Sequence, residues 1–234
     1  MSVNTGSEKS VLIWDLPVRL VHWLLVICFF GAYLTSEDEG LNLLHVTLGY
    51  TMVLLMAFRI VWGFIGSKYA RFSNFVKGPN AVMTYFESLV QKVPEHHTGH
   101  NPAGALAIIG LLLLGLLVGF SGFAALHEIW GEWGEEVHEA IANVMLILVI
   151  VHVIAVVASG WLHDESLIMS MINGAKKVDS SYAITNAHRK LAVVVLLGVL
   201  SFWAYQYVHA DVGGIDGLSS SAEQEKDHQE NDDD

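Results

Sequence analysis

Five stretches of this sequence are long and apolar enough to cross the hydrocarbon core of a bilayer as helices. A span needs about 20 apolar residues, because a helix rises about 1.5 Å per residue and the core is about 30 Å thick. The stretches lie at about residues 18–35, 43–66, 103–122, 139–162 and 191–208. Of all residues 53% are hydrophobic and only 15% are charged, too apolar a balance for a soluble domain. The sequence therefore predicts an all-α integral membrane protein.

The charged residues divide unevenly between the two sides of this predicted bundle. One side carries 11 basic and 7 acidic residues (+4), the other 1 basic and 17 acidic (−16), which sum to the net charge of −12. The positive-inside rule then places the N-terminus in the cytoplasm and the C-terminus outside. The acidic outer surface argues against nucleic acid as a partner.

Three segments organise the chain. Residues 1–178 hold the first four spans and fit one helix bundle, residues 179–210 add a fifth helix, and residues 211–234 form a polar acidic tail that we expect to be disordered. The single cysteine, Cys28, excludes an internal disulfide. No phosphate-binding glycine loop, nucleophile elbow or zinc spacing is present, so no catalytic residue is assigned.

Four of the 12 histidines lie within or at the start of predicted spans, where an ionisable side chain is costly and marks a functional site. His138 and His152 are 14 residues apart, so they project from one helix face about 21 Å apart along the axis. Because the first span runs opposite to the second and fourth, His45 matches the depth of His138, and His22 that of His152. A lone histidine is more often a core residue bonded to a carbonyl, but the matched depths favour two pairs of ligands.

Two imidazoles at one depth suit the iron of a haem. Haem iron accepts two axial imidazoles, and filling both positions leaves none for oxygen, which favours electron transfer over chemistry on a substrate. The sequence therefore predicts an outer haem between His45 and His138 and an inner haem between His22 and His152. The bundle of four core helices would bind both haems.

Two arginines are candidates for contact with the inner haem. Arg59 follows His45 by 14 residues, the interval that also separates the histidines of the fourth span, and Arg19 precedes His22 by three residues on the same face. A buried arginine is costly unless paired, and a haem propionate is a natural partner. The alternative for both is a side chain that reaches out to the inner headgroups.

These residues resemble the bacterial cytochrome b561 family, which includes the b-type cytochrome subunits of nickel-iron hydrogenases. The resemblance rests on Trp14-Asp15-Leu16-Pro17, Arg19, His22-Trp23, His45, Gly49-Tyr50, Arg59, Trp62-Gly63, Gly99-His100-Asn101-Pro102, His138 and His152. It implies haem b as the cofactor, the same four histidines as ligands, and exchange of electrons with membrane quinone in a respiratory chain. It also implies a bacterial inner membrane, with the C-terminus in the periplasm.

Two further histidines lie near the predicted inner haem. His163 is 11 residues beyond His152 and is the main rival ligand, although its place at the helix end favours a surface or quinone-site role. His100 could bond a propionate or a quinone carbonyl, or simply lie in a loop beside a helix cap. We expect quinone to react near the inner haem, among Arg19, Arg59, His100 and His163.

Three classes of function remain open. The first is an electron-transfer subunit between quinone and a redox protein outside, either a basic periplasmic cytochrome c or an oxidoreductase subunit. The second is a quinone-linked oxidoreductase that acts directly on a small substrate such as superoxide. The third is a haem-free transporter or metal-binding membrane protein. The acidic outer surface favours the first class, because it attracts a basic protein and repels an anion.

Overall fold

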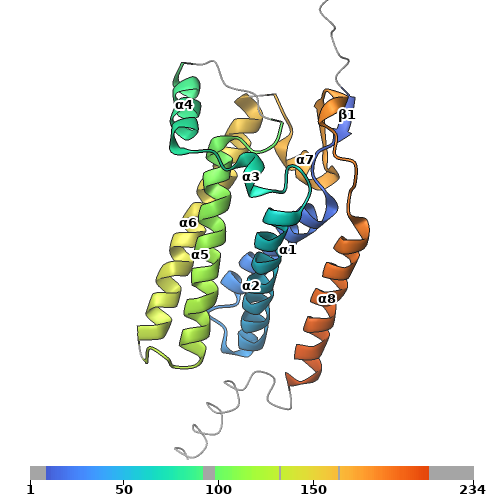
Figure 1. Cartoon of the computed structure of the whole chain (residues 1–234). Coiled ribbons are helices and arrows are strands. Elements are labelled where there is room, and N and C mark those ends of the chain that lie inside the picture. The colour runs from blue at the N-terminus through green and yellow to red at the C-terminus, as the bar shows by residue number, and fades with distance from the viewer. Residues whose placement is uncertain (1–8, 92–97, 132, 163, 211–234) are drawn as a thin grey trace, which may run out of the picture.

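Five long helices form the body of the protein in the computed structural model, which describes residues 9–91, 98–131, 133–162 and 164–210. They are α1 (Leu16–Leu34), α2 (Asn42–Ile65), α5 (Pro102–Leu126), α6 (Trp133–Leu162) and α8 (Arg189–Val208) (Figure 1). All five are long and apolar enough to span a membrane. The predicted spans are therefore confirmed, with α5 and α6 extending further than predicted at the turn that joins them. The predicted acidic tail, residues 211–234, lies outside the described residues.

Local signals fix where two of these helices begin. Asp15 precedes α1, and its side chain accepts a hydrogen bond from the backbone N–H of Val18 at 2.9 Å. Asn101 does the same for α5, accepting from Gly104 at 2.7 Å. Each cap is followed by a proline in the first turn, Pro17 or Pro102, where the missing N–H is not needed.

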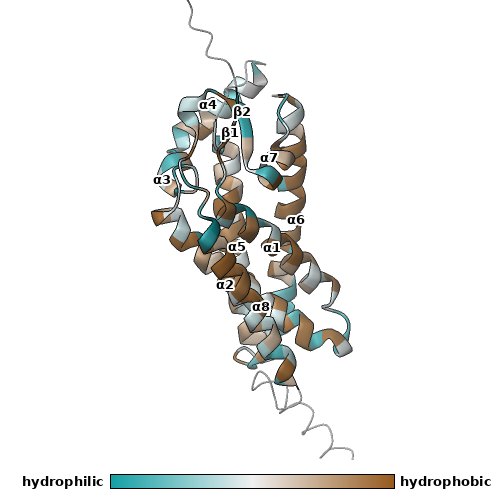
Figure 2. Cartoon of the chain, turned by 90° about the vertical axis from the view of Figure 1, so that its right-hand side faces the viewer, coloured by the Kyte–Doolittle hydropathy of each residue, from teal (hydrophilic) through white to brown (hydrophobic). Residues whose placement is uncertain are grey.

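The spans pack as two antiparallel pairs, α1 with α2 and α5 with α6. Helix α2 also contacts α5, and the buried core between the pairs is built mainly from Leu, Met and Val side chains. Most side chains of α6 are at least partly exposed, and the large exposed ones are mainly apolar. Figure 2 shows that hydrophobic residues predominate along the long helices. This is the pattern of helices surrounded by lipid, because hydrocarbon accepts apolar side chains and excludes unpaired polar groups.

Helix α8 packs against α1 and α2, on the side away from α5 and α6 (Figure 1). The indole N–H of Trp203 donates to the hydroxyl of Thr51 at 2.9 Å, and that hydroxyl donates to the carbonyl of Thr47 at 2.7 Å. Thr47 and Thr51 lie on α2 one turn apart, just after His45. The fifth helix therefore braces the helix that carries two of the predicted site residues, His45 and Arg59.

Short elements cover the end of the bundle at which α1 begins. They are β1 (Lys9–Leu12), α3 (Phe72–Phe75), α4 (Pro79–Val90), α7 (Leu167–Asn173), β2 (Ala175–Val178) and the 3-10 helix Ser180–Tyr182. Strands β1 and β2 pair antiparallel, with Lys9 opposite Val178 and Leu12 opposite Ala175. The opposite end has the 3-10 helix Glu39–Leu41. This small sheet was not predicted, because two four-residue strands so far apart in sequence carry no recognisable pattern of their own.

Candidate functional site

His45 and His138 face one another near the end of the bundle where α2 begins. Their ring centroids are 6.1 Å apart and the rings are nearly perpendicular, at 87°. Nitrogen ligands lie about 2 Å from a bound transition metal, so the ring centres of two imidazoles on opposite sides of one metal lie about 6 Å apart. The distance thus fits a shared iron atom, which stays a prediction.

Hydrogen bonds orient both rings of this outer pair. Nδ1 of His45 lies 2.8 Å from the carbonyl oxygen of Ala32, which can only accept, so Nδ1 carries the proton. Nδ1 of His138 lies 3.1 Å from the hydroxyl of Ser121, which itself donates to the carbonyl of Val118 at 3.0 Å. Ser121 therefore accepts from His138. In both rings Nε2 stays free as a ligand, and such a bond to the other nitrogen fixes a ligating imidazole.

Two glycines leave room around the outer pair. A Cβ at Gly122, on α5, would lie 2.9 Å from Cε1 of His138, so a side chain here would displace the imidazole. A Cβ at Gly49, one turn after His45, would meet no atom within 4 Å. Helix α2 thus presents an open surface beside His45, and this open surface fits a flat macrocycle.

The other predicted residues gather at the opposite end of the bundle. His22 and Arg19 lie on α1, Arg59 on α2 and His152 on α6, and His100 lies in the loop before α5. Burial, together with electrostatic repulsion from Arg59, His152, Lys176 and His22, lowers the pKa of His100 to about 3. His100 is therefore neutral at physiological pH and lies close to His22 and His152. We call His22, His152, Arg19, Arg59 and His100 together the inner cluster.

Several polar atoms of the inner cluster are buried without a hydrogen-bond partner in the described structure. They are Nε of Arg19, Nδ1 of His22, Nη1 of Arg59 and Nδ1 of His100. An unsatisfied buried polar group costs about 1–3 kcal/mol, and more if charged. Arg59 is only 7% exposed, so its guanidinium lies inside the bundle and does not extend to the headgroups. Nη1 of Arg19 donates to the carbonyl of Ile172, whereas Nε of Arg19 and Nη1 of Arg59 still lack acceptors. These two nitrogens could donate to the carboxylates of haem propionates.

Sequence reasoning missed Asp15, Ser121 and Gly122. Asp15 is fully buried, and in addition to capping α1 it accepts a hydrogen bond from the indole of Trp62 on α2 at 3.0 Å. It belongs to the Trp14-Asp15-Leu16-Pro17 motif that carries the family resemblance, but no role was assigned to it. Ser121 and Gly122 lie in an apolar helix where nothing in the sequence relates them to His138. The rival ligand His163 lies outside the described residues.

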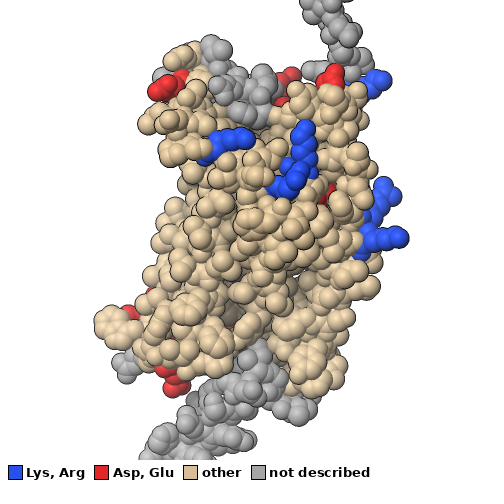
Figure 3. Space-filling view, in the orientation of Figure 1, with Lys and Arg blue, Asp and Glu red and all other residues tan. Residues whose placement is uncertain are grey.

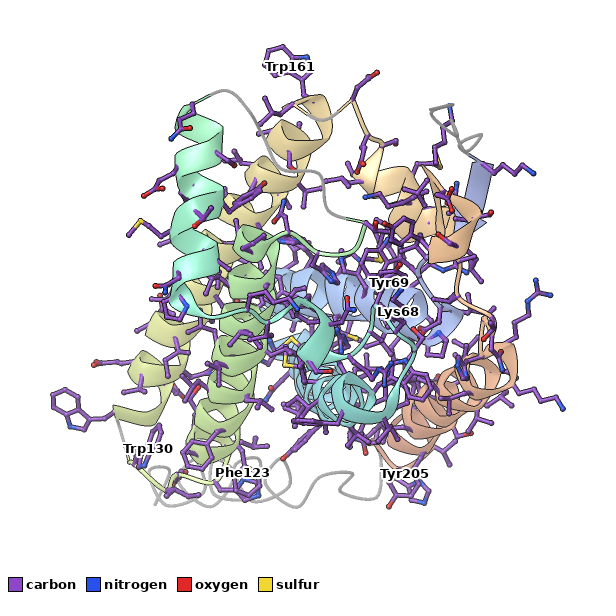
Figure 4. The ribbon with its side chains drawn as sticks, turned by 45° about the horizontal axis from the view of Figure 1, so that its top comes forward. Lys68, Tyr69, Phe123, Trp130, Trp161 and Tyr205 are labelled. Atoms are coloured by element: carbon purple, nitrogen blue, oxygen red, sulfur yellow. The ribbon has the colours of Figure 1, made fainter. Side chains whose placement is uncertain are left out.

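A cavity of about 460 Å³ lies beside the inner cluster, with His100 in its wall. It is formed between α3, α4, the start of α5 and the segment near Tyr182, and Lys68, Tyr69, Lys77 and Ala81 also line it. Figure 4 shows Lys68 and Tyr69 side by side, at the end of the bundle away from Phe123, Trp130 and Tyr205. This volume is within the usual range of about 300–1,000 Å³ for sites that bind small molecules.

Within the described residues, no group of three or more His, Cys, Asp or Glu side chains is arranged to hold a metal ion by itself. The candidate ligands come together in pairs, His45 with His138 and His22 with His152. A pair of imidazoles completes the coordination of an iron whose four equatorial positions a porphyrin fills, so the donor set suits haem.

Comparison with known proteins identifies relatives for most of this region. Residues 13–174 match the family model described as prokaryotic cytochrome b561. The chain is 24% identical over 148 residues to the probable Ni/Fe-hydrogenase 1 B-type cytochrome subunit of Escherichia coli K12, covering 52% of this chain and 63% of that protein. It is 26% identical over 147 residues to the probable Ni/Fe-hydrogenase B-type cytochrome subunit of Azotobacter chroococcum, covering 49% and 60%. The chain thus spans less than two thirds of these relatives, and no solved structure matches it.

Proposed function

The chain belongs to the prokaryotic cytochrome b561 family, and from this we propose that it holds two haems b and carries electrons across the membrane between quinone and a redox partner. The ligands are His45 with His138 and His22 with His152. Haem b supplies a one-electron carrier whose axial positions are both filled. The family supports membrane electron transfer in general, whereas the number of haems, the quinone and the partner are specific to this proposal.

The observation that carries the proposal is the geometry of His45 and His138. Two histidines that are 93 positions apart in the sequence meet with their ring centroids 6.1 Å apart, and each Nδ1 is held by a hydrogen bond that leaves Nε2 free. Histidines that bind a metal ordinarily donate the other ring N–H to a fixed acceptor in this way, which orients the ring. Arg59 and Arg19 support the inner site in the same way, through buried nitrogens that need acceptors.

The first prediction is the haem content. Purified protein should contain about two non-covalent haems b per chain, because there are two histidine pairs and no Cys-x-x-Cys-His attachment motif. A pyridine haemochrome spectrum measured against protein concentration checks the number and the haem type. One haem per chain, a covalent haem or no haem would each contradict the proposal.

We also propose that the end of the bundle with β1, α4 and the inner cluster faces the cytoplasm. In Figure 3 the Lys and Arg side chains lie over this half of the molecule, together with some acidic ones, whereas the charged side chains visible at the other end are acidic. Basic residues near the ends of spans stay on the cytoplasmic side. The N-terminus would then be cytoplasmic and the C-terminus periplasmic, and His45 and His138 would form the outer site.

The cavity beside His100 is the proposed quinone site. A neutral His100 can donate a hydrogen bond to a quinone carbonyl, and this cavity lies next to the inner cluster, at the end proposed to face the cytoplasm. Ala81 lines the cavity from α4 and belongs to neither histidine pair. The Ala81→Trp substitution should therefore raise the KM for a soluble quinol about tenfold, equivalent to roughly 1.4 kcal/mol of binding, without changing haem content. Stopped-flow reduction of the haems measures this effect.

The matched control is Met83→Trp. Met83 is on the same helix, is 64% exposed and does not line the cavity, so its replacement should leave the kinetics unchanged. An unchanged KM in Ala81→Trp would argue against this cavity. A quinone-site inhibitor that perturbs only the outer haem would place the site at the opposite end.

The partner outside is proposed to be a basic cytochrome c or an oxidoreductase subunit. Two relatives are named as subunits of Ni/Fe-hydrogenases, which supports an oxidoreductase, although they are matched over only part of their length. The charge of the outer side supports a basic protein, since acidic residues outnumber basic ones 17 to 1 there.

A further inference from the structure

Asp15 is a fully buried carboxylate at the junction of two spans, next to residues of the inner cluster. One oxygen accepts from the backbone of Val18 at 2.9 Å, and the other accepts from the indole of Trp62 at 3.0 Å. A helix cap needs only the first of these bonds, and caps are ordinarily near water. Burying an ionised carboxylate costs several kcal/mol unless charges and hydrogen bonds compensate it. The position therefore calls for a role beyond capping.

The two arginines of the inner cluster provide that compensation. Asp15 interacts electrostatically with Arg19 and with Arg59. Both guanidiniums keep one buried nitrogen without a partner, Nε in Arg19 and Nη1 in Arg59, so neither is neutralised fully within the described residues. Asp15 therefore balances part of their positive charge, while Nη1 of Arg19 donates to the carbonyl of Ile172.

The hydrogen bond to Trp62 also ties Asp15 to the end of α2 that carries Arg59. Arg59 and Trp62 are three residues apart on α2, so they share one face of the helix. Fixing the indole of Trp62 against Asp15 restrains the rotation of this end of α2, and with it the position of Arg59. On α1, Arg19 follows Asp15 by one helical turn, and its backbone N–H donates to the carbonyl of Asp15 at 3.3 Å.

We propose that Asp15 is a positioning residue of the inner site, whose buried negative charge orients Arg19 and Arg59 and lowers the midpoint potential of the inner haem. This inference rests on the proposed function, because it assumes a haem between His22 and His152. An electron added to a haem is disfavoured by a nearby negative charge, and the effect is large where the surroundings have a low dielectric constant. Removing the charge therefore raises the potential.

The test is a comparison of Asp15→Asn with Asp15→Glu in the purified haem-loaded protein. Asparagine keeps the size and an oxygen that can accept from Val18, but it loses the charge and the acceptor for the indole of Trp62, whereas glutamate keeps the charge and two acceptor oxygens. Spectroelectrochemical titration should show the inner component of Asp15→Asn shifted to a higher potential, with the outer component unchanged. Asp15→Glu should stay near the wild-type potential. Haem content and thermal unfolding are measured on the same samples.

The control is Asp179→Asn, which removes an exposed carboxylate at the same end of the bundle and should shift neither component. If Asp15→Asn keeps two haems at wild-type potentials, Asp15 is only a cap and the inference is wrong. Loss of the inner haem in Asp15→Asn but not in Asp15→Glu supports the charge role, whereas loss in both overturns it. Fewer than two haems in the wild-type protein would instead count against the proposed function.

Discussion

His138→Ala is expected to remove the outer haem and His152→Ala the inner haem, so that each variant retains about one haem per chain where the wild type has two. The two residues lie on the same helix, α6, but contribute to pairs at opposite ends of the bundle. His138 faces His45, while His152 lies with His22 and Arg59 near His100. Reduced spectra and redox titrations should show that the two variants lose different components.

The control for these variants is His127→Ala. His127 is exposed and stacks on Phe123 near the turn between α5 and α6, so its loss should leave both haems in place. Loss of the same component in both α6 variants would refute the assignment of two separate pairs. If His163→Ala, and not His152→Ala, abolishes the inner haem, the inner ligand is His163.

The rate of electron exchange with a basic cytochrome c should fall on the order of tenfold or more between 10 mM and 150 mM salt. Electrostatic steering can raise the association rate constant of two proteins by about this factor at low salt. The screening length shortens from about 30 Å to about 8 Å over this range. Glu135 and Glu136 lie in the first turn of α6, a few residues from His138, and both are exposed. Replacing both with glutamine should weaken the salt dependence, as stopped-flow oxidation of the reduced protein would show.

Glu87→Gln provides the comparison at the other end of the bundle. Glu87 lies exposed on α4, at the end of the bundle opposite Glu135 and Glu136, so its loss should not alter exchange with a partner outside. A rate that does not depend on salt would show that the acidic residues only keep the surface solvated. A fast quinone-linked reaction with superoxide would favour the alternative in which the protein is itself an oxidoreductase.

The spans and the candidate ligands could be predicted from sequence because both depend on one helix at a time. A bilayer requires about 20 apolar residues per helix, so span positions follow from hydropathy alone. The helical repeat places His138 and His152 on one face, and Arg59 at a known interval from His45. Alternating span direction then matches the depths of the histidines without any knowledge of how the helices pack.

Side-chain partners were decided only by the tertiary structure, because they depend on how each helix is rotated and how closely it approaches its neighbours. Trp62 meets Asp15 across 47 residues of sequence, and Ser121 meets His138 across a turn between helices. The pairing of β1 with β2 likewise joins the two segments that flank the region matched by the family, residues 13–174. No periodicity encodes these contacts. Sequence therefore determined the membrane architecture and the candidate ligands, and packing determined which polar groups orient them.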